Sequence, residues 1–337
     1  MTGWTVTGFA AWVADATGGR RRWTSQAAVA TASGLAQRGA RAHDTVFARV
    51  AARRIAAASP ADRKALETAL AEVGDDAAVI ERAAASGAPV AAVAGLAARW
   101  ETLPAQPREW VRSPLGLNSV GPVKWGQVNA TQVDQTTCGA ATLSLLGMLA
   151  DPFVALWVAT GQSIGAYQPP EVLRSEVQRL PAHTVEERWN SLQRATHLAS
   201  TRMAVGPLPW PRALGTPPWR ADNIARCAGV RMRGLIINDA VPTDLAAALA
   251  HASAALRDGI PVPVYVGGDS SIGIDSVMPR HVVLLTGRVG DTLHIYEPGS
   301  GTVHEVEISA LAQPHGRLKA LGNWNRIVWL VLPTPRG

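Results

Sequence analysis

The residue best placed for nucleophilic chemistry is Cys138, which lies where a loop gives way to a predicted helix within residues 130–149, ATQVDQTTCGAATLSLLGML. A sulfur at a helix N-terminus meets unpaired backbone N–H groups and the positive end of the helix dipole. Both stabilise a thiolate, which is the nucleophilic form of cysteine. The next residue, Gly139, has no side chain to crowd an incoming carbonyl group. The pattern therefore predicts covalent acyl chemistry at Cys138.

Charge that develops on an attacked carbonyl oxygen needs hydrogen-bond donors. Gln132 lies six positions before the cysteine (138 minus 132), and its side-chain amide is a candidate donor. Together with the backbone N–H of Cys138 it would form a two-donor oxyanion hole. Gln135 is the competing residue, and the spacing favours Gln132.

The general base predicted for this thiol is His281, one of eight histidines in the chain. It opens the apolar strand 281–285, where a rigid strand end can hold the imidazole in a cleft. Glu297 lies sixteen residues later (297 minus 281), at the far end of the next predicted strand, 292–298. A carboxylate there would accept the second imidazole N–H and select the useful tautomer.

Four segments carry a resemblance to a known family: residues 132–146 (QVDQTTCGAATLSLL), 244–267 (DLAAALAHASAALRDGIPVPVYVG), 281–287 (HVVLLTG) and 296–301 (YEPGSG). They resemble papain-like cysteine peptidases and are most similar to the bacteriocin-leader-processing peptidase domains and their stand-alone bacterial relatives. That family shows Gln, a short gap and Cys-Gly before a helix, then a strand that starts with His and a strand that ends in Asp-Pro. The resemblance covers roughly residues 125–335, interrupted by 151–240.

The resemblance implies a papain-like fold and thiol-dependent acyl transfer, with no metal or other cofactor. It implies Cys138 as nucleophile, His281 as base, Gln132 as oxyanion donor and Glu297 in the orienting position. No transporter segment is attached, so leader processing coupled to export is not expected.

One departure from the family concerns the third member of the triad. The family usually has Asp or Asn where this chain has Glu297, whose side chain is one methylene longer. Asn323 and Asn325 are the alternative third members.

Strand and helix patterns predict the α+β class. Tightly spaced strands at 261–267, 281–287, 292–298, 302–308 and 325–332 indicate an antiparallel sheet, and the capped segment 244–257 indicates a helix. We expect three parts in the chain: a helical N-terminal domain at 1–102, a Pro-rich linker at 103–122, and a papain-like catalytic domain at 123–337 with a loop- and helix-rich insertion at 151–240.

In the N-terminal part, apolar spacing predicts helix within 25–59, and Ser59-Pro60 starts another that ends near Gly74. The longest apolar stretch is 139–161, but Asp151-Pro152 breaks it into halves too short to cross ~30 Å of hydrocarbon. No signal peptide is recognisable at the N-terminus. We therefore expect a cytoplasmic protein without a membrane span, and export without a cleaved signal stays open.

Composition argues against several other classes. The net charge is +6, but the arginines are scattered and no aromatic-interleaved basic motif is present, so nucleic-acid binding is not expected. Two cysteines are too few for a disulfide scaffold or a CxxC zinc site. His304-Glu305 lacks the HExxH spacing of a zinc peptidase.

Some residues have plainer interpretations. No pattern of candidate catalytic residues accompanies Cys227 in the sequence, so it is predicted to be a core residue. Trp210 and Trp219 lie in Pro-rich loops and are candidates to line a substrate groove. The loop Gly268-Asp269-Ser270 is expected to border the cleft just before the histidine.

The leading hypothesis is a cysteine peptidase or amidase that acts on a peptide or protein substrate through an acyl-enzyme. The first alternative is a toxin- or effector-like enzyme performing deamidation or transamidation, because only the group that resolves the thioester differs. The second is a catalytically inactive papain-like binding domain. The N-terminal helices are expected to contact a partner or to mask the cleft, by analogy with helical prosegments.

Overall fold

The computed structural model describes residues 45–116, 119–205, 207–238, 241–268, 281–312 and 316–334. Two predicted features lie outside these residues: the part of the first helical segment before residue 45, and the Gly268 loop from Asp269 onward. The helices are α3 (Val46–Ala57), α4 (Pro60–Glu72), α5 (Ala77–Ala85), α6 (Val90–Trp100), α7 (Ala105–Arg112), α8 (Cys138–Ala150), α9 (Pro152–Thr160), α10 (Ser175–Gln178), α11 (Val185–Thr201), α12 (Pro218–Ile224), α13 (Pro242–Arg257) and α14 (Ile308–Ala312), with short 3-10 turns η1 (Gly74–Asp76), η2 (Arg212–Leu214) and η4 (Lys319–Leu321).

The strands are β1 (Gly121–Pro122), β2 (Lys124–Trp125), β3 (Val128–Asn129), β4 (Arg231–Ile236), β5 (Val262–Gly267), β6 (His281–Val289), β7 (Thr292–Glu297), β8 (Thr302–Glu307) and β9 (Arg326–Thr334). Seven of them form one sheet in the order β1-β8-β7-β6-β5-β9-β4, and β2 pairs with β3. Every pairing is antiparallel. The chain is therefore α+β, as the strand spacing predicted.

Strand β4 was not expected. Residues 151–240 were predicted to hold loops and helices, yet β4 lies within them and pairs along its whole length with β9. Its sequence, RMRGLI, is short and carries Arg at alternate positions, so it lacks the β-branched run that marks the other strands. Residues 231–236 form a strand because they pair with the buried strand β9, and no local sequence pattern predicts that pairing.

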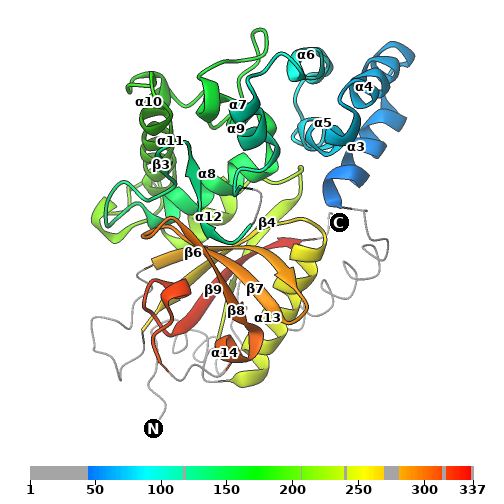
Figure 1. Cartoon of the computed structure of the whole chain (residues 1–337). Coiled ribbons are helices and arrows are strands. Elements are labelled where there is room, and N and C mark those ends of the chain that lie inside the picture. Colours follow the sequence, from blue (N-terminus) through cyan, green and yellow to red (C-terminus); the bar gives the residue numbers. More distant parts are fainter. Residues whose placement is uncertain are drawn as a thin grey trace.

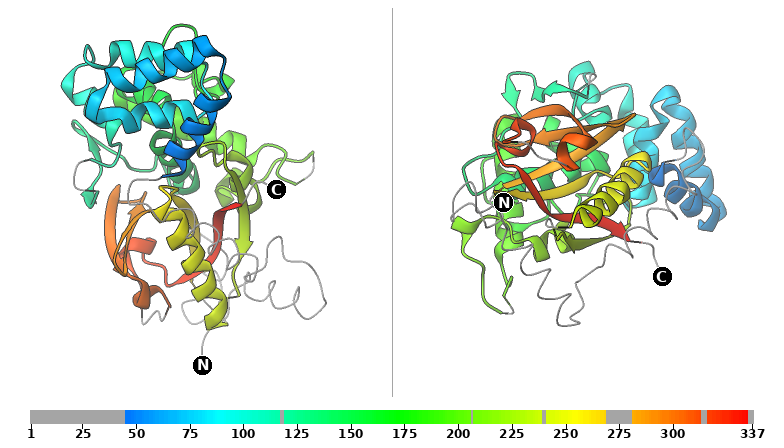
Figure 2. Two further views of the ribbon diagram at one scale, coloured as in Figure 1. Left: turned by 90° about the vertical axis from the view of Figure 1, so that its right-hand side faces the viewer. Right: turned by 90° about the horizontal axis from the view of Figure 1, so that it is seen from below.

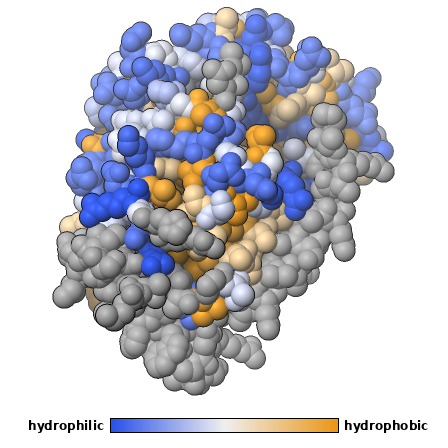
Figure 3. All heavy atoms as spheres, turned by 60° about the horizontal axis from the view of Figure 1, so that its bottom comes forward, coloured by the Kyte–Doolittle hydropathy of each residue, from blue (hydrophilic) through white to orange (hydrophobic). Residues whose placement is uncertain are grey.

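Helices cover the sheet on two sides (Figure 1). Helix α8 packs between β6 and helix α11, so it is buried on all sides. Helix α13 lies along the opposite face, against β5, β6 and β9 (Figure 2). On the face turned forward in Figure 3, apolar side chains gather toward the centre and hydrophilic ones surround them. Because α8 packs on β6, its first turn and the start of β6 come from adjacent layers of the molecule.

The predicted break in the long apolar stretch is present. Helix α8 ends at Ala150, and Asp151 caps α9 by accepting a hydrogen bond from the Phe153 N–H at 2.9 Å. The two helices are bent by 110°, and only as a pair do they match a membrane span in length and composition. No single helix in the described residues is long and apolar enough to cross a membrane.

Hydrogen bonds from two half-buried arginines join helices α3–α6 to the rest of the chain. Arg82 donates to the carbonyl oxygens of Leu149 and Val111 at 3.0 and 2.8 Å. From the other side, Arg226 donates to the Ser86 carbonyl oxygen at 2.9 Å. These contacts cross the boundary expected near residue 102.

The prolines of residues 103–122 predicted a linker, but this segment is not extended throughout. They contain α7, which packs against α9, and β1, which adds an edge strand to the sheet. The prolines are compatible with this helix because Pro104 is the residue just before it and Pro107 lies in its first turn, where a missing N–H costs no hydrogen bond.

Candidate active site

Cys138 is the first residue of α8, as predicted, and only 4% of it is exposed. The loop before it is held by Asp134, whose Oδ1 accepts the Thr136 N–H at 2.8 Å and whose N–H donates to Thr137 Oγ1 at 3.0 Å. Thr137 is the N-cap residue, but its side chain makes no capping bond to the helix. The first backbone N–H groups of α8 therefore have no side-chain cap and can serve an anion at the sulfur or beside it.

One side-chain hydrogen bond clamps α8 to β6. Thr142, one helical turn after Cys138, donates through Oγ1 to the Val282 carbonyl oxygen at 3.0 Å, and this bond is buried. Because residues i and i+4 share a helix face, the bond holds the cysteine face toward the start of β6. Val282 follows His281 directly, so this contact sets the separation of thiol and imidazole.

His281 opens β6 and contacts both expected partners. Its Nε2 lies 2.7 Å from Glu297 Oε1, which leaves Nδ1 for the hydrogen bond with the Cys138 thiol. Burial alone would lower the pKa of His281, but the hydrogen bonds with Cys138 and Glu297 outweigh it and raise this pKa to about 9. The imidazole is therefore held in its protonated form at neutral pH.

Glu297 is buried, and its carboxylate is well supplied with donors. It accepts the backbone N–H of Gly299 at 2.7 Å and of Ser300 at 2.8 Å in addition to the imidazole. Burial alone would raise the pKa of Glu297, but the bonds from His281, Ser300 and Gly299 outweigh it and lower this pKa to about 2. The carboxylate is charged across the whole physiological range.

The longer side chain of Glu297 has a geometric reason. Leu284 lies opposite Tyr296, so one further step would place Glu297 opposite Val283. His281 is then two residues along the same face (283 minus 281), a diagonal neighbour at ~7–8 Å in a sheet of this kind. A glutamate has the extra methylene that such a diagonal contact needs.

Among the described residues, neither alternative third member forms a side-chain hydrogen bond with the imidazole. Asn323 is exposed, and its backbone is in the left-handed region at φ +66°. Asn325 is half-buried, with a side-chain oxygen that has no hydrogen-bond partner among the described residues. Glu297 is the residue that the structure brings to His281.

Gln132 lies beside the same turn but is engaged elsewhere. Its backbone N–H donates to the Pro298 carbonyl oxygen and its side-chain amide donates to the Asp134 carbonyl oxygen, both at 2.8 Å. Gln135 is exposed. The loop is thus anchored next to Glu297, and the role of Gln132 in an oxyanion hole stays a prediction that requires its side chain to rotate.

The space beside Gly139 is filled by another segment. A Cβ at this position would lie 2.7 Å from Thr216 Cβ and 3.3 Å from Val282 Cγ2. The missing side chain therefore admits Thr216, from the 151–240 stretch, and does not leave room for a substrate carbonyl as expected. Close packing of three segments at the first turn of α8 is what requires glycine.

Gly322 is a residue that the sequence patterns did not single out. Its φ is +62°, and a Cβ there would lie 2.5 Å from Cδ2 and 2.7 Å from Nε2 of His281. The turn after η4 thus packs directly against the imidazole. The dipeptide Gly322-Asn323 is a turn signal, but nothing local connects it to a histidine far away in the sequence.

A second missed residue is Tyr265 on β5. Its side chain is buried, and its hydroxyl has no hydrogen-bond partner among the described residues. Burial, and then the nearby Cys138 and Asp222, raise the pKa of Tyr265 well above its usual value. It is therefore a neutral hydroxyl on the sheet side of the thiol.

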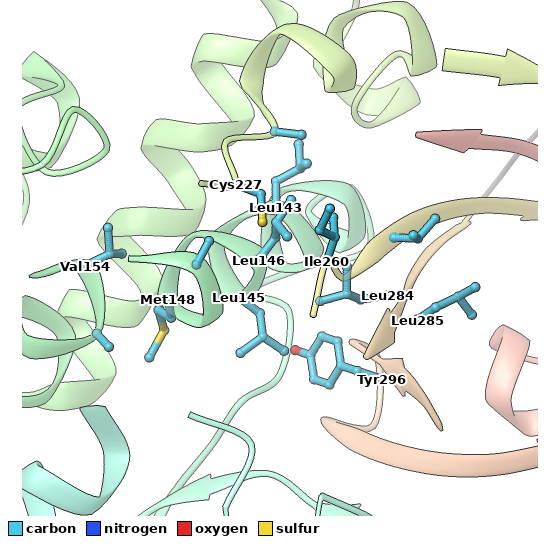
Figure 4. Packing of buried hydrophobic residues seen from close by; sticks show 14 of the residues in the cluster. Leu143, Leu145, Leu146, Met148, Val154, Cys227, Ile260, Leu284, Leu285 and Tyr296 are labelled. Atoms are coloured by element: carbon cyan, nitrogen blue, oxygen red, sulfur yellow. The ribbon is translucent and has the colours of Figure 1, made fainter. Parts of the chain in front are cut away.

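The remaining predicted residues pack against partners other than Cys138, His281 and Glu297. Trp210 and Trp219 pack edge to face on each other, with ring centroids 5.1 Å apart. Cys227 is fully buried and faces Leu143 and Leu146 in the core (Figure 4). In the part of the chain that the structure describes, no three metal-ligating side chains come together.

No protein-family model matches this chain, and no curated protein matches its sequence.

Proposed function

We propose that this chain is a papain-like cysteine peptidase or amidase. The observation that carries the proposal is the His281 imidazole between two partners, with Glu297 Oε1 at 2.7 Å from Nε2 and the Cys138 thiol on the other side. A cysteine, its base and an orienting group within hydrogen-bond reach are the mark of an activated nucleophile. The papain-like fold is supported by a buried helix that presents the thiol to an antiparallel sheet carrying the other two groups.

The reaction begins with attack of the Cys138 thiolate on a substrate carbonyl carbon. The carbonyl π electrons move onto oxygen, and the uncapped N–H groups at the start of α8 stabilise that charge. The imidazolium of His281 then gives its proton to the leaving amine as the C–N bond breaks, which leaves a thioester. His281 next takes a proton from water, the resulting hydroxide attacks the thioester, and the departing sulfur regenerates the thiolate.

Glu297 neither attacks nor carries the proton in this scheme. It stabilises the imidazolium and holds the ring with Nδ1 toward sulfur. Deamidation would follow the same steps with ammonia as the leaving group. Transamidation would differ only in that an amine resolves the thioester.

The contacts of helices α3–α6 bear on the idea that they mask the cleft. In the described residues, they pack on one another, on α9 and on Asp258 after α13, where Arg49 forms an ion pair. Arg82 and Ser86 also form the hydrogen bonds to the rest of the chain described above. None of these contacts involves Cys138, His281 or Glu297. The proposal therefore assigns no masking role to residues 45–100.

The test is mass-spectrometric profiling of a peptide library incubated with the full chain and with its Cys138→Ala variant. Peptide-bond cleavage that needs Cys138 supports a peptidase, and conversion of Gln to Glu supports a deamidase. If both proteins leave the library unchanged while peptides bind, the chain is a binding domain and the proposal is wrong.

A further inference from the structure

A cavity of about 470 Å³ opens beside the loop that leads into α8. Thr136 and Thr137 form part of its wall. Thr137 directly precedes Cys138, and adjacent Cα atoms are ~3.8 Å apart. The cavity therefore adjoins the residue that precedes the thiol, and Cys138 itself is not part of its lining.

Three arginines from separate segments line this cavity, and we call it the arginine pocket. Arg179 follows α10, Arg194 lies on α11 and Arg212 starts η2. All three are exposed. Against the other described residues, none of the three makes a side-chain hydrogen bond or an ion pair, so their guanidinium donors face solvent.

The acidic residues of the pocket are already engaged. Glu176 forms an ion pair with Arg202 at 2.8 Å. Asp134 Oδ1 accepts hydrogen bonds from the Thr136 N–H and Oγ1 at 2.8 and 2.7 Å. Burial lowers the pKa of His197 against the opposing effect of Asp134, so this imidazole is neutral at pH 7. Three arginines minus two carboxylates leave the lining at +1, or +2 once Arg202 is included.

We propose that the arginine pocket binds a carboxylate of the substrate, either an aspartate or glutamate side chain or a free C-terminus, next to the bond attacked by Cys138. The inference rests on the proposed function, because it assigns a substrate class to that site. A guanidinium matches a carboxylate with two parallel N–H donors, and arginines from three segments can approach one anion from several directions. The two resident carboxylates favour a singly charged guest over a dianion.

The experiment measures binding of fluorescent hexapeptides to the full chain carrying Cys138→Ala, which prevents turnover. Each peptide has a Glu or a Gln at one position in turn, and a second set compares free with amidated C-termini. We expect the Glu or free-acid peptide to bind about tenfold more tightly than its neutral twin at the position that reaches the pocket. The position of the preference distinguishes a side chain from a C-terminus.

Arg194→Gln combined with Arg212→Gln should remove the preference and leave the neutral peptide bound as before. The matched control is Arg233→Gln, an exposed arginine on β4 outside the pocket lining, which should change nothing. Arg194→Glu should reverse the preference toward a Lys-containing peptide. Equal binding of all charged and neutral twins, or a preference that survives the double variant, overturns the proposal.

Alkylation of the wild-type chain with iodoacetamide separates this inference from the proposed function. Rapid labelling of Cys138 without any Glu preference would support an activated thiol and contradict carboxylate binding by the arginine pocket. Slow labelling of Cys138 with an intact Glu preference would contradict the activated thiol and support the arginine pocket.

Discussion

Both cysteines of this chain are buried, Cys138 as the first residue of α8 and Cys227 in the core, yet their surroundings differ. Cys227 packs against apolar side chains, and burial raises its pKa to about 12 against the opposing effect of Arg226. Cys138 is almost as buried, at 4% against 0% exposure, but it has His281 as a hydrogen-bond partner. The nearby guanidinium of Arg226, already paired with Asp151 and Glu171, does not offset the burial of Cys227, whereas the His281 imidazole forms a hydrogen bond with Cys138 itself.

The largest expected effect comes from removing either Cys138 or His281, which form a hydrogen-bonded pair. Cys138→Ala and His281→Ala should each lower turnover by at least ~10⁴-fold, because the two residues act as one unit. Cys227→Ala should retain turnover and lower the free energy of unfolding by about 1 kcal/mol, the cost of a small cavity. Steady-state kinetics and urea unfolding measure both. Loss of turnover in a folded Cys227→Ala variant would reverse the roles of the cysteines.

Changes at Glu297 should have a smaller effect. Glu297→Gln keeps an acceptor but removes the charge, and should lower turnover by about 10–10³-fold. Glu297→Asp keeps the charge but falls short of the diagonal contact with His281, so we expect a similar loss. Asn323→Ala and Asn325→Ala are the controls. If one of these abolishes turnover and Glu297→Gln does not, the third member is misplaced.

Alkylation compares the two thiols directly. At pH 7, iodoacetamide should modify Cys138 at least ~100-fold faster than Cys227, because the thiolate is the reactive form. Peptide mapping after short exposures gives both rates in one sample. The His281→Ala variant should bring the two rates together, and a rate ratio unchanged by that substitution would show that His281 does not activate the thiol.

Gly322→Ala tests how the imidazole is positioned. The new Cβ would displace the His281 ring, and we expect turnover to fall on the order of 10–100-fold. Gly290→Ala is a matched control, because Gly290 also has a positive φ, of +57°, but nothing within 4 Å of its added Cβ. Both variants carry the same kind of backbone strain, so only a drop confined to Gly322→Ala identifies a positioning role.

The smallest expected effect is a shift in the pH dependence of turnover. His281 has a pKa of about 9 in the folded chain against 6.5 when free, so its stabilising contribution is complete below 6.5 and is lost as pH rises through about 9. Turnover should fall on the alkaline side near the same pH, because the imidazolium must protonate the leaving amine. Glu297→Gln should move this alkaline limb to lower pH. A limb that does not move would mean that the carboxylate does not stabilise the imidazolium.

The contribution of Glu297 has the opposite sign. Its folded pKa of about 2 lies below the free value of 4.5, so its stabilisation is present above pH 4.5 and is lost as pH falls toward 2. The acid side of the turnover profile should therefore not reflect this carboxylate.

Much of the fold was predictable from local patterns. Five strands, the break at Asp151 and the start of α8 at Cys138 follow from apolar periodicity and from helix-start and helix-stop signals. Strand β4 was missed, because its pairing with β9 and not its own residues makes it a strand.

By itself the sequence determined which chemical groups are available and at which element ends they stand: a cysteine at a helix start, a histidine at a strand start and a glutamate at a strand end. These positions follow from interactions among residues close in the chain. Only the tertiary structure decided how the groups meet. Thr142 clamps the helix to β6, the sheet register sets the diagonal reach of Glu297, and Gly322 packs on the imidazole. Each of these contacts joins residues distant in sequence, and no local pattern encodes the packing that brings them together.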